Sequence, residues 1–445
     1  MSHSTSKPQF LIAAPASGSG KTTITLGLLR AFANKGLRVQ PFKCGPDYLD
    51  PIHHKIAARK TSINLDTFMA SASHVNQLYQ KYTAQVDMSV TEGVMGLFDG
   101  AVKMTGSSAE IAALLQIPVI LVINAQAMAY SAAPLIYGFK NFYAGIQLKG
   151  VIFNQVNSAS HYSFLKDACH DAGVEALGYL PHQPDLTIPS RHLGLTTSTQ
   201  IDFDALCNRI AAAMAKTVNL ERLLQITATP VPVLDKSTAI FPLPTIPIKI
   251  AVALDEAFSF TYQENLEVFK EYGEVVFFSP LQDTELPACD LLYLAGGYPE
   301  LFLAELSRNK KMITAIRKYC KNGGRTYAEC GGMMYLGQAI TDSKGQEYEM
   351  VNFLPVTTSM ENPKLHLGYR CVTSNNLEIK GHEFHYSTCK ELDDVTMLPS
   401  QITNARGLAV PVRIYQKQQT LASYLHLYWG EQKDFIQKLL NGSGW

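Results

Sequence analysis

The segment APASGSGKTT, residues 14–23, constrains the fold of this chain more than any other part of the sequence. It follows a short apolar run at residues 9–14 and precedes a stretch with helical periodicity at residues 21–35. A glycine-rich turn between a strand and a helix binds phosphate through its backbone N–H groups and the positive end of the helix dipole. The segment therefore predicts a P-loop, although Pro15 replaces the first glycine of the usual pattern.

Six consecutive residues of this loop are the predicted ATP-binding residues. Lys21 would reach the β- and γ-phosphates, and the Thr22 hydroxyl would bind Mg²⁺. A glycine-rich turn that binds nothing is the structural alternative. The predicted set is Gly18, Ser19, Gly20, Lys21, Thr22 and Thr23.

Two further segments supply polar side chains that would lie near this loop. VTEGVMGLFDG, residues 90–100, follows a predicted strand and places Glu92 and Asp99 where carboxylates can hold Mg²⁺, unless they only cap turns. PFKCGPDYLDPIHH, residues 41–54, follows the second predicted strand and is rich in polar groups. From it we predict Asp47, Tyr48 and Asp50 as substrate or acyl-phosphate residues, and a solvated loop is the alternative.

The arrangement of apolar runs predicts a two-domain α/β protein. Runs ending at Val90, Asn124 and Asn154 are continuous and separated by helical stretches, which is typical of a parallel sheet buried on both faces. Residues 226–247 hold five prolines without a regular period, and strand-like runs resume at 248–254, 275–278, 291–297 and 325–332. We predict domains at residues 1–225 and 248–445, joined by a linker at 226–247.

A cysteine stands at a second predicted turn, in RTYAECGGMMYLGQAI at residues 325–340. A strand-to-helix elbow would expose Cys330 at a helix N-terminus, which we expect to lower the pKa of its thiol. Gly296 and Gly297, in AGGYPE, would supply an oxyanion hole. A core cysteine is the alternative to this nucleophile.

A cysteine nucleophile needs a base, and three histidines compete for that role. We predict His426, in ASYLHLYWG, because it ends a predicted strand near the close of the domain. His382 and His385, in GHEFHYS, are the alternatives. The other cysteines form no CxxC pair, which argues against a zinc site or a disulfide framework and indicates reduced thiols.

Taken together, these motifs resemble those of the cobyrinic acid a,c-diamide synthases over essentially the whole chain. The first half is similar to dethiobiotin-synthetase-like P-loop domains, and the second half to class I glutamine amidotransferases with a G/E-C-G-G turn. The resemblance implies an ATP- and Mg²⁺-dependent amidoligase domain and a glutaminase domain. It implies that the a and c acetate carboxylates of a corrin are amidated through an acyl phosphate, with ammonia from glutamine.

One departure from the wider amidotransferase pattern affects the predicted catalytic residues. The usual triad has a glutamate two residues after the histidine, and Tyr428 stands there in this chain. The corrin-amidating branch is similar in lacking that glutamate, which implies a dyad of Cys330 and His426. What orients the imidazole is left open.

Several alternatives remain at this stage. Nickel-sirohydrochlorin and hydrogenobyrinate a,c-diamide synthases share the same motifs, so the residues do not separate them from the cobyrinate enzymes. Cobyric acid synthase is also similar, but its loop after the second strand lacks the GPDYLDP pattern found here, which argues against it. A ParA/MinD-like ATPase switch with an inactive amidotransferase module is the alternative from another class, but its signature lysine is replaced by Ala16.

Charge and hydropathy bear on the location and the partners of the chain. With 38 basic and 38 acidic residues it has no net charge to attract nucleic acid or a membrane, and the apolar residues 111–139 are interrupted by polar ones. We expect a cytoplasmic enzyme with small-molecule substrates, and a homodimer is left open.

Overall fold

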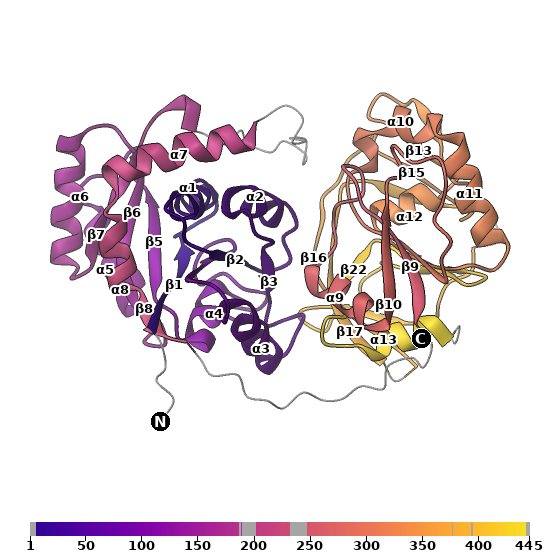
Figure 1. The fold of residues 1–445 in the computed structure, drawn as a ribbon, viewed down its shortest axis with the longest axis horizontal. Coiled ribbons are helices and arrows are strands. Elements are labelled where there is room, and N and C mark those ends of the chain that lie inside the picture. Colours follow the sequence, from indigo (N-terminus) through magenta and orange to yellow (C-terminus); the bar gives the residue numbers. More distant parts are fainter. Residues whose placement is uncertain are drawn as a thin grey trace. The chain divides into compact units, whose positions relative to one another are not determined.

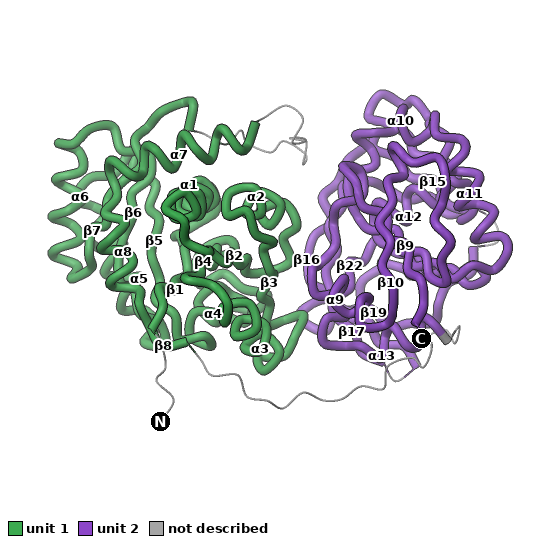
Figure 2. Tube along the Cα trace, viewed as in Figure 1, with its two compact units in different colours: residues 1–191, 196–237 green, residues 192–195, 238–445 purple. Residues whose placement is uncertain are grey.

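The computed structural model describes residues 6–186, 188, 202–231, 247–375, 377–392 and 395–441. The described residues fall into two compact units, up to residue 231 and from residue 247 (Figure 2). Each unit is an α/β structure built on its own sheet (Figure 1), which confirms the predicted fold class.

The first unit has an eight-stranded sheet among the residues that the structure describes. Its order is β3-β2-β4-β1-β5-β6-β7, with parallel pairing throughout, and β8 pairs antiparallel with β1. The strands are β1 Ser6–Ala13, β2 Val39–Cys44, β3 Ile63–Leu65, β4 Met88–Glu92, β5 Val119–Asn124, β6 Leu148–Val156, β7 Glu175–Pro181 and β8 Ala228–Pro230.

Helices cover both faces of this sheet. Phe10 and Ile12 of β1 pack into a core with α1, α2 and α7, whereas Gln9 points to the other face and accepts a hydrogen bond from Tyr79 of α3 at 2.9 Å. The helices are α1 Lys21–Asn34, α2 Leu49–Ala58, α3 Ala72–Thr83, α4 Ser108–Leu115, α5 Ala132–Asn141, α6 Ala159–Asp171, the 3-10 helix η1 Pro184–Leu186, α7 Phe203–Thr217 and α8 Leu220–Ile226.

The first unit extends beyond residue 225, where the sequence placed its end. Ile226 closes α8, and Ala228–Pro230 forms β8, whose backbone pairs with Ser6–Pro8 of β1. The prolines there had suggested a linker, but Pro230 is the last residue of an edge strand, a position that tolerates a missing N–H. Residues 232–246 of the predicted linker lie outside the described residues.

The main sheet of the second unit has the order β10-β9-β11-β12-β21-β20, parallel except for β20. Residues 339–427 supply β13 to β22. Of these, β20 and β21 join the main sheet, and the others form two smaller sheets, β14-β13-β15-β18 and β19-β16-β17-β22. The strands are β9 Ile248–Ala253, β10 Gly273–Phe278, β11 Leu291–Leu294, β12 Arg325–Glu329, β13 Ala339–Thr341, β14 Glu347–Glu349, β15 Val356–Ser359, β16 His366–Ser374, β17 Leu377–His385, β18 Thr388–Glu391, β19 Gln401–Asn404, β20 Ile414–Lys417, β21 Thr420–Ser423 and β22 Leu425–Leu427.

Short helices complete the second unit. They are α9 Gln263–Tyr272, the 3-10 helix η2 Pro299–Leu301, α10 Leu303–Arg308, α11 Lys310–Lys321, α12 Gly331–Leu336 and α13 Asp434–Asn441. Among the described residues of the whole chain, no helix has the length and apolar character needed to cross a membrane.

Candidate active sites

The glycine-rich loop connects β1 to α1 in the first unit, as predicted. Gly18 and Gly20 have φ of 79° and 94°, a region that glycine adopts readily. A Cβ on Gly20 would lie 2.0 Å from Nδ2 of Asn154, so no larger residue fits there. The same Asn154 amide donates to the Ser19 carbonyl at 3.2 Å and holds the loop from the end of β6.

The first turn of α1 carries the predicted phosphate and metal residues. The Lys21 ammonium is buried and donates to the Met95 carbonyl, and burial lowers the pKa of this lysine. The Thr22 hydroxyl donates to Oε1 of Glu92 at 2.7 Å. Thr23 lies in the same turn and is half-buried. The structure therefore brings Thr22 and Glu92 together.

Glu92 is the centre of a buried ionic cluster at the carboxyl ends of β2 and β4. Lys43 Nζ lies 3.2 Å from its Oε1 and 2.6 Å from Asp50 Oδ2, and His54 Nε2 lies 2.7 Å from its Oε2. Burial alone would raise the pKa of Glu92, but Lys43 and His54 hold it below its ordinary value. Glu92 is therefore a carboxylate at neutral pH.

The contacts of the other predicted residues of the first unit are local and do not by themselves indicate a metal or substrate role. Asp99 Oδ2 accepts from the Gly96 N–H at 2.9 Å, and Asp47 Oδ1 accepts from the N–H groups of Leu49 and Asp50 at 2.9 and 3.0 Å. Asp99 thus makes the turn-capping contact that the sequence offered as its alternative, and its role toward Mg²⁺ stays a prediction. Asp47 also caps a turn, although the sequence had offered a solvated loop as its alternative. Tyr48 is buried, and Asp50 pairs with Lys43. Substrate contacts of Asp47, Tyr48 and Asp50 stay predictions.

In the second unit, Cys330 occupies a strained turn between β12 and α12. Its φ is 44° and its ψ is −104°, a rare conformation for a residue with a side chain. A Cβ on Gly331 would lie 3.0 Å from the backbone N and O of Gly297, and one on Gly332 would lie 2.3 Å from the Leu294 carbonyl oxygen. The two glycines after Cys330 thus let the turn pack against the end of β11.

The thiol of Cys330 does not have the low pKa expected from the sequence. Burial raises its pKa well above the ordinary value, and Glu300 adds to the increase. The short helix α12 does not outweigh this desolvation. Sγ lies 3.6 Å from the Phe384 carbonyl oxygen, a contact in which a protonated thiol donates. Cys330 therefore rests as a neutral thiol.

His426 lies beside the predicted oxyanion loop. A Cβ on Gly296 would lie 2.3 Å from its Cε1, so the glycine makes room for the imidazole. The ring is fully buried on β22. Burial lowers the pKa of His426 well below the ordinary value, and the neighbouring His382 lowers it further. The structure thus places His426 against Gly296 and the turn of Cys330 against Gly297, on either side of the same two glycines.

The two competing histidines have different surroundings. His382 stacks on His426 with ring centroids 4.9 Å apart, and its Nδ1 contacts the Tyr262 hydroxyl at 2.9 Å. Burial lowers the pKa of His382 to about 3. His385 contacts Glu383 at 2.9 Å and is three residues further along β17, on its other face. Of the three histidines, His426 is the one that lies against Gly296, which supports its choice as the base.

Comparisons with known proteins match both halves of the chain. The CobQ/CobB/MinD/ParA nucleotide binding domain matches residues 10–195, and the CobB/CobQ-like glutamine amidotransferase domain matches residues 249–434. Cobyrinate a,c-diamide synthases match nearly the full length. The protein of Streptococcus sanguinis is 38% identical over 97% of this chain and 98% of its own, that of Dehalococcoides mccartyi (strain CBDB1) 39% over 97% of each, and that of Picrophilus torridus 40% over 94% and 95%.

The chain belongs to the cobyrinate a,c-diamide synthase family.

This membership confirms the family that the sequence motifs had suggested. The full-length matches to synthases do not favour a ParA/MinD-like switch, because that likeness would be confined to the nucleotide-binding half. The oxygen donors of Thr22 and Glu92, 2.7 Å apart, are of the kind that Mg²⁺ prefers, so this pair fits the metal that P-loop enzymes use with ATP.

The sequence did not predict three residues that lie at these sites, Lys43, His54 and Glu329. Lys43 and His54 lie within the recognised loop segment but were not singled out, and only the fold shows that both contact Glu92. Glu329 immediately precedes Cys330. Its Oε2 lies 3.9 Å from His426 Nδ1, while Leu427 N–H, Tyr293 OH and Tyr327 OH donate to it at 2.8–3.1 Å. The sequence signal that could have identified Glu329 is a charged residue at the end of a predicted buried strand, directly before the cysteine.

Proposed function

We propose that this chain is a cobyrinate a,c-diamide synthase that amidates the a and c acetate carboxylates of cobyrinic acid with ATP and glutamine. The observation that supports this proposal most strongly is the presence of both half-sites in one member of the family. One is the P-loop with its Glu92 cluster, and the other is Cys330 with His426. The small-molecule partners are therefore ATP, glutamine and a tetrapyrrole carboxylate.

In the first unit, the proposed step transfers the γ-phosphoryl group of ATP to a substrate carboxylate. The products are an acyl phosphate and ADP, and the acyl phosphate then offers phosphate as a leaving group to ammonia. The backbone of Gly18, Ser19 and Gly20 would hold the phosphates, and Lys21 would exchange its contact with Met95 for a phosphate oxygen. Thr22 and Glu92 would hold Mg²⁺, which offsets phosphate charge when it is bound.

In the second unit, the proposed step starts from an uncharged pair of residues. Cys330 is a neutral thiol and His426 a neutral imidazole, because burial disfavours both charged forms. When Sγ attacks the glutamine amide carbon, His426 would take the thiol proton and deliver it to the departing ammonia. N–H groups of Gly296 and Gly297 would stabilise the oxyanion. Water then hydrolyses the thioester to glutamate.

Glu329 is the proposed positioning residue for His426. We expect Glu329→Gln to lower kcat for glutamine hydrolysis about tenfold, because an amide is a weaker acceptor for an imidazole N–H than a carboxylate. Burial raises the pKa of Glu329 to about 8, so the carboxylate forms as the pH rises through that value. The wild-type advantage over the variant should therefore grow from pH 7 to pH 9. An unchanged ratio of the two rates across that range would contradict this role.

Two variants of the first unit separate the proposed metal and substrate roles. Glu92→Gln keeps the shape but removes the charge that would hold Mg²⁺, so amidation should fall at least about a hundredfold and Mg²⁺-dependent ATP binding should weaken. Asp47→Asn keeps an oxygen that can accept from Leu49 and Asp50, so α2 should stay capped. It should lower amidation while leaving ATP affinity near that of the wild type.

Fluorescence titration with a labelled ATP analogue and product analysis would measure both effects. Arg38→Ala is the matched control, because this exposed residue pairs with Asp87 and lies just before the amino end of β2, at the opposite end of the strand from Lys43. Equal loss of ATP binding in Glu92→Gln and Asp47→Asn would show that the roles are divided wrongly.

The choice of tetrapyrrole needs a direct comparison. Purified protein with ATP, Mg²⁺ and glutamine would be offered cobyrinate, hydrogenobyrinate and nickel-sirohydrochlorin separately, and the rates of diamide formation compared. Fastest turnover of cobyrinate would support the proposal. Faster turnover of another macrocycle would show that this macrocycle, and not cobyrinate, is the substrate. ATP turnover without glutamine hydrolysis would favour the ATPase switch instead.

A further inference from the structure

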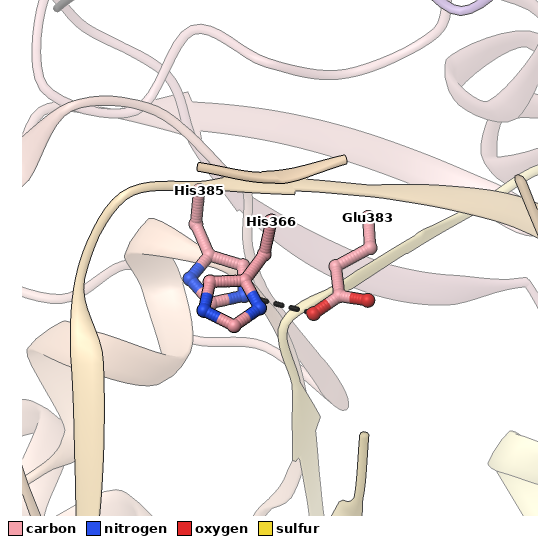
Figure 3. Close-up of side chains that lie close together, drawn as sticks. All are labelled: His366, Glu383 and His385. Carbon is pink, nitrogen blue, oxygen red and sulfur yellow. Dashed lines mark hydrogen bonds and ion pairs between the residues drawn. The ribbon is translucent and has the colours of Figure 1, made fainter. Parts of the chain in front are cut away.

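A cluster of two histidines and a glutamate lies on strands β16 and β17, outside the residues assigned above to either half-reaction (Figure 3). His366, the first residue of β16, is directly opposite His385, the last residue of β17. Glu383 is two residues before His385 and therefore shares its face of the strand. The register of one hairpin thus brings three potential metal ligands together.

The spacing of the donor atoms is close to that of a metal site. One donor atom from each residue lies within 4.8 Å of the others, and His385 Nε2 is 2.9 Å from Glu383 Oε1. Zinc bonds of roughly 2.0–2.2 Å at tetrahedral angles place neighbouring ligand atoms about 3.3–3.6 Å apart. His385 and Glu383 would therefore move apart by roughly half an ångström to hold the ion, and His366 would approach by about 1 Å.

The rings of His366 and His385 are parallel, with centroids 4.7 Å apart and planes 1° apart. Parallel ring planes cannot both contain one ion, so His366 must turn to bind it. This residue is half-buried and lines a cavity of about 540 Å³ that also contacts Glu383 and His385. The cavity gives His366 room to turn and leaves space for water ligands.

The neighbours of these residues hold the donor atoms in orientations that suit a metal. His385 Nδ1 contacts the Ser387 carbonyl at 2.9 Å, which places a proton on Nδ1 and aims Nε2 at Glu383. Arg370 binds Glu383 through Oε2, at 2.8 Å from Nε and 2.6 Å from Nη2, so Oε1 stays directed at the histidines. Such outer contacts are typical of metal-ligating histidines and carboxylates.

We propose that His366, Glu383 and His385 bind one divalent transition-metal ion, for which zinc is the probe, at a site separate from the Mg²⁺ site for ATP. Two imidazole nitrogens and one carboxylate oxygen favour zinc or cobalt over Mg²⁺, which prefers oxygen ligands.

The proposed site has a structural link to Cys330. Phe384 lies between Glu383 and His385 in β17, and its carbonyl oxygen is the group 3.6 Å from Cys330 Sγ. An ion bound by the residues on both sides of Phe384 would hold this stretch of backbone in place. Metal binding should therefore raise the Tm of the second unit's unfolding transition as well as give a binding signal.

The test uses the full-length protein after removal of metal with a chelator. Zinc is titrated by calorimetry in the presence of millimolar Mg²⁺, and cobalt(II) is added separately to record its absorption spectrum. We expect one zinc per chain and a cobalt spectrum without a thiolate charge-transfer band. His366→Ala, which removes the half-buried ligand, should weaken zinc binding at least about tenfold.

Two controls make the result specific. His170→Ala removes an exposed histidine outside the cluster, with 89% of its side chain accessible, and should bind zinc like the wild type. Cys330→Ser should also retain binding, because no thiol is among the proposed ligands. Glu383→Gln provides a second ligand variant, and its circular dichroism and Tm would show that it is folded.

Three results would each overturn the proposal. The first is failure of the wild-type protein to bind zinc in the presence of Mg²⁺. The second is equal zinc affinity in the wild type, His366→Ala and folded Glu383→Gln. The third is a thiolate band in the cobalt spectrum that disappears in Cys330→Ser. None of these results would bear on the proposed amidation, because that activity is measured separately with Mg²⁺ alone.

Discussion

Cys330→Ala should abolish glutamine hydrolysis and glutamine-dependent amidation, with a loss of at least about a thousandfold in each. The Sγ atom of Cys330 is the group assigned to the attack on the glutamine amide, and no other thiol lies in the predicted turn. Phosphoryl transfer is assigned to the first unit and should be unaffected. Added ammonia should therefore restore diamide formation, more strongly at high pH, where more of it is the free base.

The same experiment tests the role of His426. A low-pKa thiolate would keep part of its reactivity without a base, but burial raises the pKa of Cys330. We therefore expect His426→Ala to lose glutaminase activity almost as completely as Cys330→Ala, and ammonia to rescue both.

Cys289→Ala removes a half-buried thiol outside the site and is the matched control for these variants. Product formation from each nitrogen donor would be followed by mass spectrometry, and glutamate release by a coupled assay. Glutamine hydrolysis by Cys330→Ala, or a folded variant that cannot use ammonia, would refute the proposed division between two sites.

Lys21→Ala should lower amidation about a hundred- to a thousandfold with either glutamine or ammonia as the nitrogen donor. Both routes need the acyl phosphate, and the variant lacks the ammonium that would bind the transferred phosphoryl group. The Lys21 ammonium is buried against the Met95 carbonyl, and no carboxylate of the described residues is in hydrogen-bond contact with it, so its charge is available to a phosphate. Glutamine hydrolysis, assigned to the second unit, should persist.

Lys35→Ala is the matched control, since this exposed lysine stands at the other end of the same helix and should leave all activities unchanged. ADP formation and diamide formation would be measured in parallel. Normal ammonia-dependent product formation by Lys21→Ala would remove the P-loop from the mechanism.

The sequence by itself determined the features that depend on local order along the chain. Continuous apolar runs separated by helical stretches indicated parallel sheets, because such strands are buried on both faces. Gly18, Gly20 and Lys21 marked the turn between β1 and α1, and Cys330 marked the turn between β12 and α12, because both patterns are contiguous.

The tertiary structure decided what depends on residues far apart in the sequence. Lys43, His54 and Glu92 meet because β2 and β4 are neighbours in the sheet, and no short-range pattern encodes that pairing. Hairpin register likewise brings His366 to His385, and strand order brings Glu329 near His426. The pKa of Cys330 also depends on the whole fold. The sequence predicted a lowered value from the helix N-terminus, but burial by the surrounding domain raises it, because desolvation depends on every atom packed around the thiol.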